Sequence, residues 1–444
     1  MMESLRLRGG RRFDMEFPMH LPPARVIALL ILTLCAPAAA RVIGVGPDRE
    51  ARTLEAAIAR AKVGDEIVLD RAIEHLTSGV VVSVDAVEIR SADGPGEPAT
   101  IRNISTGKWP VTIEHRAEGL ILKDLIMAGA EGVNITAIRG KGARLTVDNV
   151  SPSASVWRFV HIDGAQQTVV RNCTAPVLPD YTVCSFGGIS RNLILERCTF
   201  GGSVKEHTIR LHKIQGALLR DSTFDVGGKK SALTIRDGAD VRVENCTING
   251  PVAIGPVADG DGGINLPTDT PQQRAQREAM LRRNLRDVTL ENCTINTNGI
   301  NVEMGTENLV LEACSIKTNK QSALRLNRDE YEPWRKIPSG RLVHCELIGP
   351  PGLRPFETPR PDFHAVGTVI NGVRVPDTAE PTTQPSAPGG AVPAEAPTTQ
   401  PTEQVHAQRS DVLAALDRVE DALAQLHLAR ARLHASMQPV ADTR

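Results

Sequence analysis

A repeat of about 24 residues runs through the middle of the chain and limits the folds that it can adopt. One position of this repeat is filled by Leu125, Val150, Cys173, Cys198, Ser222, Cys246, Cys293 and Cys314. Successive members lie 25, 23, 25, 24, 24, 47 and 21 residues apart. We interpret the separation of 47 as two periods, the second of which carries an insertion. A period in the low twenties with short apolar runs predicts a solenoid, in which every coil contributes the same positions.

Apolar and polar residues alternate on both sides of the repeated position. In one repeat the apolar members are Val241, Val243, Cys246 and Ile248. A period of two is typical of strands, so we expect two strands that meet at this point. Asparagine precedes the position at Asn149, Asn172, Asn245 and Asn292. Because Asn tolerates a left-handed backbone, these residues predict a corner, followed by a buried column of cysteines that bind no metal.

The overall charge and the aromatic content exclude some classes of partner. Lys and Arg number 51 against 52 for Asp and Glu, so the chain lacks the excess positive charge that nucleic-acid binding needs. Only 3 Trp, 2 Tyr and 8 Phe are present, which disfavours a sugar-binding module built on a stacking platform. Beyond Cys35 the chain has seven cysteines, an odd number that argues against a complete disulfide framework.

Residues 1–40 have the order of a secretory signal peptide. Basic Arg11, Arg12 and Arg25 precede an apolar run at 26–34, and three alanines follow at 38–40. The run is about half the ~20 residues that a spanning helix needs, and no other stretch is longer. We therefore predict a secreted, periplasmic or cell-surface protein with no stable membrane span.

The sequence TLEAAIARAKVGDEIVL at 53–69 resembles the opening of right-handed parallel β-helix proteins of the pectin-lyase-like superfamily. In those proteins a short amphipathic helix caps the solenoid and a Gly-Asp turn leads to the first strand. Here Thr53 can cap a helix whose apolar face is formed by Leu54, Ala57, Ile58 and Ala61. The resemblance covers about 42–349 and implies an all-β, right-handed parallel β-helix. It implies no single activity, because the superfamily includes lyases, hydrolases, epimerases and non-catalytic surface proteins.

We predict a β-helix domain at 41–375 with two insertions, at about 256–287 and 327–339. The first contains Asp259, Asp261 and Asp269, followed by a helix to about residue 283. Calcium is the cation that these carboxylates could take, but their spacing differs from that of a known calcium loop, so we predict no cofactor. The second insertion contains Tyr331 and Trp334, which makes it the favoured place for ligand stacking.

The C-terminal region differs in composition from the repeat. Residues 376–404 are mostly Pro, Thr, Ala and Gln, which predicts an extended linker. Within 405–437, apolar residues at alternating spacings of four and three predict one amphipathic helix: Val412, Leu416, Val419, Leu423, Leu426 and Leu433. Such a helix is marginal alone. It would either associate with a second copy or another partner, or fold back on the solenoid.

Polar side chains on neighbouring coils are expected to share the outer face of the solenoid. Inward Ile209 and Leu211 leave Thr208, Arg210 and His212 outside. In the next coil Thr234 should lie beside Arg210, and Arg236 beside His212. His161 and Asp163 should occupy the same face upstream, and Glu303 should oppose Arg325 downstream.

This outer strip could act on an acidic polysaccharide. Cleavage by elimination needs a cation that neutralises the carboxylate and a base that removes the neighbouring carbon-bound proton. Arg210, Arg236 and His212 are the predicted catalytic residues, and the predicted substrate contacts are Asp163, Lys213, Glu303, Arg325 and Trp334. The familiar catalytic motifs of the superfamily are missing. Two hypotheses therefore remain: a β-helix that binds, and in one version cleaves, an extracytoplasmic acidic polysaccharide, and a non-catalytic surface or envelope scaffold with a self-associating tail.

Overall fold

A computed structural model describes residues 40–377 except 165, 189, 229, 256–284, 304, 327–337 and 358–361. Several predictions from the sequence lie outside the described residues. They are the signal peptide, the acidic loop with its helix, Trp334, the linker and the C-terminal helix. Within the described ranges, no helix is long and apolar enough to cross a membrane.

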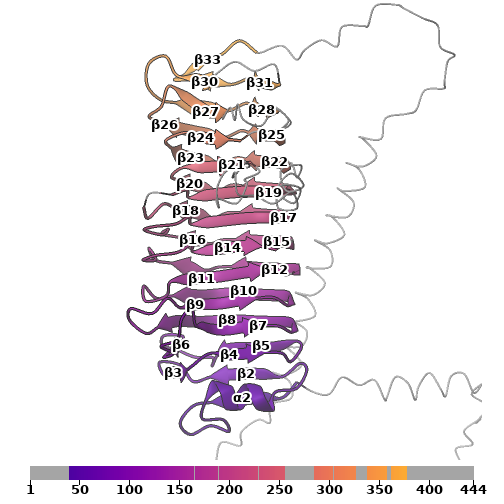
Figure 1. Ribbon diagram of the computed structural model, residues 1–444, viewed down its shortest axis with the longest axis vertical. Coiled ribbons are helices and arrows are strands. Elements are labelled where there is room, and N and C mark those ends of the chain that lie inside the picture. The colour runs from indigo at the N-terminus through magenta and orange to yellow at the C-terminus, as the bar shows by residue number, and fades with distance from the viewer. Residues whose placement is uncertain are drawn as a thin grey trace, which may run out of the picture. The chain divides into compact units, whose positions relative to one another are not determined.

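The described chain winds into a right-handed parallel β-helix of about 12 turns (Figure 1). Each turn carries up to three strands, and equivalent strands of successive turns pair in parallel to form three columns. The fold class predicted from the repeat is confirmed.

Four long strands each contribute to two columns: β8 (Glu118–Gly129), β10 (Ala143–Pro152), β17 (Ile209–Arg220) and β19 (Leu233–Glu244). The first column contains β1 (Val42–Val45), β2 (Glu66–Leu69), β5 (Val87–Ser91), β8 (Glu118–Gly129), β10 (Ala143–Pro152), β12 (Gln166–Arg171), β15 (Arg191–Glu196), the ends of β17 (Ile209–Arg220) and β19 (Leu233–Glu244), β22 (Leu285–Glu291), β25 (Thr306–Glu312), β28 (Gly340–Val343) and β31 (Phe363–Val366). The second contains β3 (Glu74–Thr77), β6 (Ala99–Asn103), the ends of β8 and β10, β13 (Thr174–Ala175), β16 (Thr199–Phe200), β18 (Thr223–Asp225), β20 (Thr247–Asn249), β23 (Thr294–Thr297), β26 (Ser315–Thr318), β29 (Glu346–Ile348), β32 (Val369–Ile370) and the antiparallel β33 (Val373–Arg374). The third contains β4 (Val80–Val82), β7 (Val111–His115), β9 (Thr136–Gly140), β11 (Arg158–Asp163), β14 (Cys184–Gly187), the starts of β17 and β19, β21 (Val252–Ile254), β24 (Ile300–Val302), β27 (Ser322–Leu326) and β30 (Arg354–Phe356).

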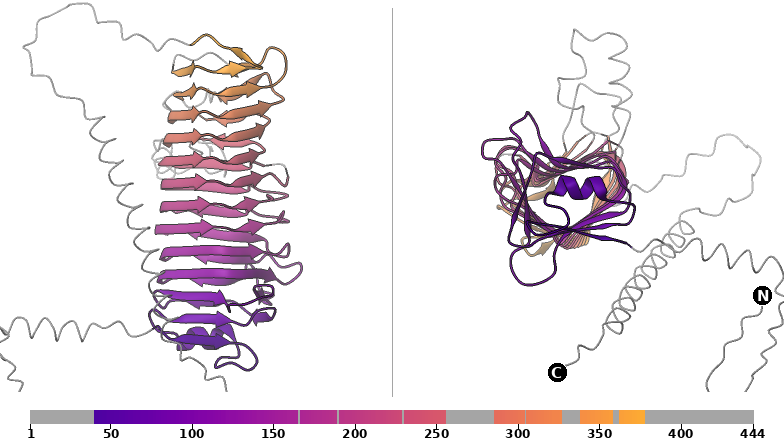
Figure 2. Two further views of the ribbon diagram at one scale, coloured as in Figure 1. Left: turned by 180° about the vertical axis from the view of Figure 1, so that it is seen from behind. Right: turned by 90° about the horizontal axis from the view of Figure 1, so that it is seen from below.

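Helix α2 (Leu54–Arg60) covers the first coil, as Figure 2 shows in the view along the solenoid. The Thr53 hydroxyl accepts a hydrogen bond from the Ala56 N–H at 3.2 Å, which satisfies one of the free amides of the first turn. Leu54 and Ala57 are buried, while Ile58 and Ala61 pack at the edge of the core. The predicted cap is therefore present, with the apolar face that the sequence indicated.

The cysteine column lies inside the solenoid. Cys173, Cys198, Cys246, Cys293 and Cys314 are buried and free, and Cys345 continues the column one coil further. Cys246 is typical, because its Sγ donates to the carbonyl of Glu244 at 3.2 Å. In one of the coils without cysteine at this position, Ser222 Oγ donates to the Arg220 carbonyl at 2.7 Å.

One interpretation of the repeat is wrong. Thr247 pairs directly with Thr294, so Cys246 and Cys293 lie in adjacent coils and their separation of 47 residues is one period, not two. The excess length is the segment 256–284 between β21 and β22. The ladder resumes at Leu285, which pairs with Gly238, slightly before the predicted end of the insertion.

The polar corners between the first and second columns are as expected. Asn149, Asn172, Asn245 and Asn292 have φ between 51° and 54°, in the left-handed region. Their side chains also link coils: Asn172 Nδ2 donates to Asp148 Oδ1 at 2.7 Å, and Arg197 Nε donates to Asn172 Oδ1 at 2.9 Å. These bonds run along the solenoid and add to the backbone ladder.

Candidate functional site

Two rows of side chains follow the outer face of the third column. The first row runs through Glu114, Arg139, His161, Ser185, Arg210 and Thr234, on β7, β9, β11, β14, β17 and β19. The second row lies two residues later on the same strands and includes Asp163, Gly187, His212 and Arg236. Because successive coils are about 4.8 Å apart, each row brings together residues that are distant in the sequence.

The sequence predicted the cross-strand neighbours of Arg210 and His212 correctly, but not the burial of the two threonines beside them. Arg210 lies opposite Thr234 and His212 opposite Arg236, as predicted. Thr208 and Thr234, however, are buried rather than exposed. Thr208 Oγ1 donates to the carbonyl of Asp225, because Thr208 belongs to the turn before β17 and not to its alternation. Thr234 Oγ1 hydrogen-bonds to His207 Nδ1 at 2.9 Å.

The remaining predicted contacts are dispersed. Asp163 is exposed at the end of β11, and Lys213 is half-buried with φ of 58°. The predicted opposition of Glu303 and Arg325 is wrong, because Arg325 pairs with Asn301. Glu303 instead packs against the position of Gly255, and Arg325 forms an ion pair with Glu357 at 3.7 Å.

His212 has an acidic partner that the sequence reading missed. Its Nε2 lies 3.3 Å from Oδ2 of Asp237, the residue after Arg236 on β19. Asp237 is buried and has φ of 51°, so the strand bends there and turns the carboxylate toward the imidazole. The two side chains are only 15% and 6% exposed, so the pair is held out of bulk water.

A cluster of nitrogen-bearing side chains lies near the start of the first row. Arg139 Nε, Arg158 Nε and His161 Nδ1 are buried and have no hydrogen-bond partner among the described residues. Neither Arg139 nor Arg158 forms an ion pair with an acidic side chain in the described ranges. We call Arg139, Arg158 and His161 the arginine patch.

Burial is the main influence on the pKa of His161 and of Arg158. Burial and, to a smaller extent, the charges of Arg158 and Arg139 together lower the pKa of His161 to about 4. The pKa of Arg158 is also lowered, first by burial and then by Arg139 and Arg210, although an arginine remains charged at any physiological pH. At neutral pH the patch therefore holds two guanidinium groups beside an uncharged imidazole.

Three aromatic rings border the arginine patch. The ring centroids of Trp109 and Trp157 are 4.4 Å apart, as are those of Trp157 and Tyr181. The Arg158 guanidinium lies 3.9 Å from the centre of the Tyr181 ring, within cation–π distance. Trp157 is buried, whereas Trp109 is 49% exposed and has φ of 62°, an unusual backbone angle for a bulky residue. The low aromatic content disfavours a stacking platform, yet three of the few rings gather here, tilted by 52° and 36° to one another.

The sequence contained a partial signal for this site. Arg139 lies between Ile138 and Gly140 in the same alternating phase as His161, so the strip could have been extended upstream. Arg158 was hidden because Phe159 and Val160 are both buried, which interrupts the alternation of β11. The aromatic stack joins three loops and has no local signature. The described residues include no group of three His, Cys, Asp or Glu side chains that could hold a metal ion.

Comparisons with known proteins find similarity at the level of solved structures. No protein-family profile matches the chain, and no curated protein sequence is significantly similar to it. The A-module of the mannuronan C-5 epimerase AlgE4 from Azotobacter vinelandii is 13% identical, with a TM-score of 0.47 over 70% of this chain and 87% of that one. The catalytic domain of a GH87 alpha-1,3-glucanase is 14% identical, with a TM-score of 0.42 over 75% and 69%. An alginate lyase from Paenibacillus sp. str. FPU-7 is 14% identical, with a TM-score of 0.38 over 75% and 96%.

Proposed function

We propose that the protein binds an acidic polysaccharide on the outer face of the third column, at the arginine patch. The observation that carries this proposal is the pair Arg139 and Arg158, two half-buried guanidinium groups without an acidic partner among the described residues. Keeping such charges out of water without a counter-ion is costly. A ligand carboxylate would remove that cost, and the planar guanidinium fork matches its geometry.

An extended sugar polymer fits the site better than a small acid. The first row continues from Arg139 to Arg210 over four adjacent strands, so anionic groups at separate points of one extended chain can meet both arginines. Trp109, Trp157 and Tyr181 provide aromatic surface beside the cations. The apolar face of a sugar ring can stack on such a surface while its carboxylate reaches an arginine.

Calorimetric titration with uronic-acid oligomers tests this proposal. Arg139→Ala and Arg158→Ala should each weaken binding about tenfold or more, the range expected for hydrogen bonds to charged groups. Arg191→Ala is the matched control, because Arg191 is an exposed arginine on β15 in a different column. Equal affinity in the parent and both patch variants would refute the proposal.

Cleavage by elimination is a second candidate, favoured by the pair His212 and Asp237. An imidazole oriented by a buried carboxylate can take the proton from the carbon next to a sugar carboxylate. The bond from the neighbouring carbon to the glycosidic oxygen then breaks, which leaves an unsaturated sugar, and the leaving oxygen takes a proton. Arg236, directly opposite His212, would neutralise the substrate carboxylate.

The absorbance of the unsaturated product measures this activity. His212→Ala should abolish turnover and leave binding largely intact, because a base acts mainly in the transition state. Arg236→Ala should reduce binding as well as turnover. Binding without turnover in the parent protein would exclude elimination and leave a polysaccharide-binding solenoid.

The predicted signal peptide would place this protein outside the cytoplasm, and a self-associating tail would give it several binding faces.

A further inference from the structure

The turns between the second and third columns change length abruptly along the solenoid. The turn at 226–232 before β19 has seven residues, whereas those at 250–251 and 298–299 have two and that at 319–321 has three. A short turn reaches less far from the core than a long one. The described structure accordingly has a notch of about 800 Å³ at this step, beside the turn at 226–232.

Backbone geometry fixes the floor of the notch. Gly250 has φ of 147°, and a Cβ atom at this position would lie 2.6 Å from Cβ of Val226. Only glycine allows the short turn to pack so closely against the preceding coil. Pro251 then stiffens the turn. The notch is therefore built into the fold, since its floor cannot take larger side chains.

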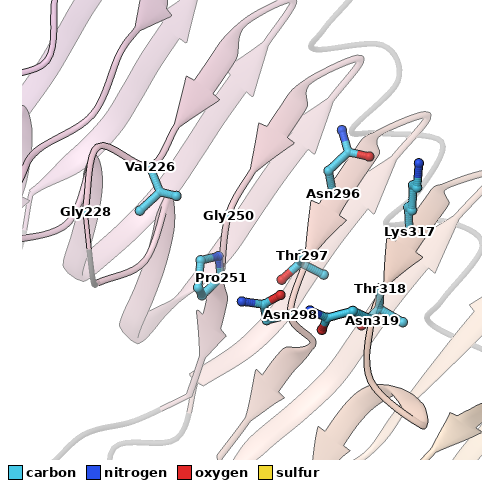
Figure 3. A pocket seen from close by; sticks show the side chains of 10 residues that line it. All are labelled: Val226, Gly228, Gly250, Pro251, Asn296, Thr297, Asn298, Lys317, Thr318 and Asn319. Carbon is cyan, nitrogen blue, oxygen red and sulfur yellow. The ribbon is translucent and has the colours of Figure 1, made fainter. Parts of the chain in front are cut away.

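The lining of the notch is rich in amides, and Lys317 is the one ionisable side chain that it contains. Its members are Val226, Gly228, Gly250, Pro251, Asn296, Thr297, Asn298, Lys317, Thr318 and Asn319. Figure 3 shows Pro251, Asn298 and Asn319 following one another on successive coils. The side-chain amides of Asn298 and Asn319 are exposed and have no hydrogen-bond partner among the described residues. Each amide can both donate to and accept from a ligand.

A row of side chains linked by hydrogen bonds orients the amide of Asn296 at the outer edge of the notch. Asn249 Nδ2 donates to Asp225 Oδ1 at 2.6 Å, and Asn296 Nδ2 donates to Asn249 Oδ1 at 2.7 Å. These bonds use one N–H of Asn296 and turn its amide in a fixed direction. Lys317 follows Asn296 in the same register and is the one cation of the lining.

We propose that this notch is a second binding site and that it takes a neutral oligosaccharide. Sugar hydroxyls are donors and acceptors at once, which suits the paired functions of Asn296, Asn298 and Asn319. Val226 and Pro251 provide an apolar wall for the C–H face of a sugar ring. An acidic chain is a poor ligand here, because Lys317 is the one cation of the lining and is exposed. Its attraction for a carboxylate is therefore screened by water and salt, in contrast to that of the arginine patch. The lining holds no pair of carboxylates for glycoside hydrolysis, so the proposal is one of binding and not of cleavage.

The notch is separate from the arginine patch. Its coils, β19 to β27, follow β11 by three or more strands of the third column, which corresponds to about 14 Å or more along the solenoid. A polymer with neutral and acidic stretches could reach both sites, but each can bind without the other. Binding at the notch should depend little on salt, whereas binding at the arginine patch should weaken as salt increases.

Calorimetric titration with neutral hexasaccharides of glucose, mannose and xylose tests the proposal. We expect the parent protein to bind at least one of them with the same affinity at 50 and 500 mM NaCl. The double variant Asn298→Ala, Asn319→Ala should bind it about tenfold more weakly or worse, because two hydrogen bonds are lost from an exposed surface. Gln215→Ala, which removes an exposed amide from β17, is the matched control and should have no effect.

The arginine variants distinguish this site from the proposed one. Arg139→Ala with Arg158→Ala should leave binding of the neutral hexasaccharide unchanged while weakening that of the uronic-acid oligomer. The proposal is overturned if no neutral hexasaccharide binds, if the double asparagine variant binds as tightly as the parent, or if a capped peptide of six residues binds and competes at the notch instead.

Discussion

His161 on β11 lies directly opposite Arg139 on β9, and Nδ1 of the imidazole and Nε of the guanidinium are both buried without a hydrogen-bond partner among the described residues. Backbone pairing brings the two side chains together, because their strands occupy neighbouring coils. Two unsatisfied nitrogens side by side destabilise the free protein. In the proposed function, a ligand carboxylate bound to the guanidinium would compensate part of this cost.

Acid should destabilise the fold before most carboxylates titrate. Burial lowers the pKa of His115, His161 and His207 to about 4, from an ordinary value of 6.5. Between these values the unfolded chain binds more protons than the folded one, so the free energy of unfolding falls as the pH decreases from about 6.5 to 4. Urea denaturation at pH 7.5, 6.5, 5.5 and 4.5 measures this slope.

His115 allows the slope to be assigned. It is completely buried on β7, and neither ring nitrogen has a hydrogen-bond partner within the described structure. His115→Leu removes the titrating group and should make the acid slope shallower than that of the parent. An unchanged slope in this variant would show that His115 does not contribute, and a flat profile in the parent would contradict the burial argument.

Removing the exposed aromatic ring should weaken binding without unfolding the protein. Trp109 is half-exposed and stacks on Trp157, so its loss costs little core packing. Trp109→Ala should bind uronic-acid oligomers about three- to tenfold more weakly, consistent with about 0.5–1.5 kcal/mol for one aromatic contact. Titration calorimetry and thermal melting give both quantities. Val177→Ala, at another exposed apolar side chain, should change neither, and equal binding by Trp109→Ala would exclude the ring from the site.

The asparagine corners can be separated into backbone and side-chain contributions. Asn245 has φ of 51° and donates to Asp221 Oδ1 at 3.1 Å. Asn245→Ala loses the hydrogen bond and adds left-handed strain, for a total cost of about 2 kcal/mol. Asn245→Gly loses the bond but relieves the strain, so it should be less destabilising than the alanine variant. If glycine is the more destabilising substitution in chemical denaturation, the corner is not limited by φ.

The cysteines should be inert in the folded protein. Burial raises the pKa of Cys246 to about 12, and Cys173 and Cys184 are shifted upward as well. Hydrogen bonds with Cys314 lower the pKa of Cys293 and Cys345, but their thiols are buried like the others. The seven described cysteines should therefore resist a thiol reagent such as Ellman's at pH 8 and react once guanidinium unfolds the chain. Rapid labelling of a native chain that lacks residues 1–40 would contradict the inward column.

Local patterns in the sequence predicted the coil but not the contacts between distant loops. Alternation around Ile209 and Leu211 placed Arg210 and His212 on the outer face, and their cross-strand neighbours followed from the repeat. The same logic failed at Thr208, because a turn residue does not follow the strand alternation. It also failed across the segment 256–284, where length alone could not distinguish a long coil from two short ones.

The most informative part of the site needed the structure. Trp109, Trp157 and Tyr181 precede three different strands, and no periodicity relates them. Their contact depends on how far each loop reaches, which in turn depends on the packing of the coils. Arg158 was similarly hidden by the two consecutive buried residues that follow it. Asp237 was visible as a charge after Arg236, but only the bend at φ of 51° directs it to His212.

A crystal structure of the protein with a bound uronic-acid hexasaccharide tests the central claim most directly. We predict a sugar carboxylate within hydrogen-bond distance of the Arg139 or Arg158 guanidinium, and a sugar ring against Trp109 or Tyr181. An oligomer bound elsewhere on the solenoid, with no sugar group at the arginine patch, would contradict the proposed site.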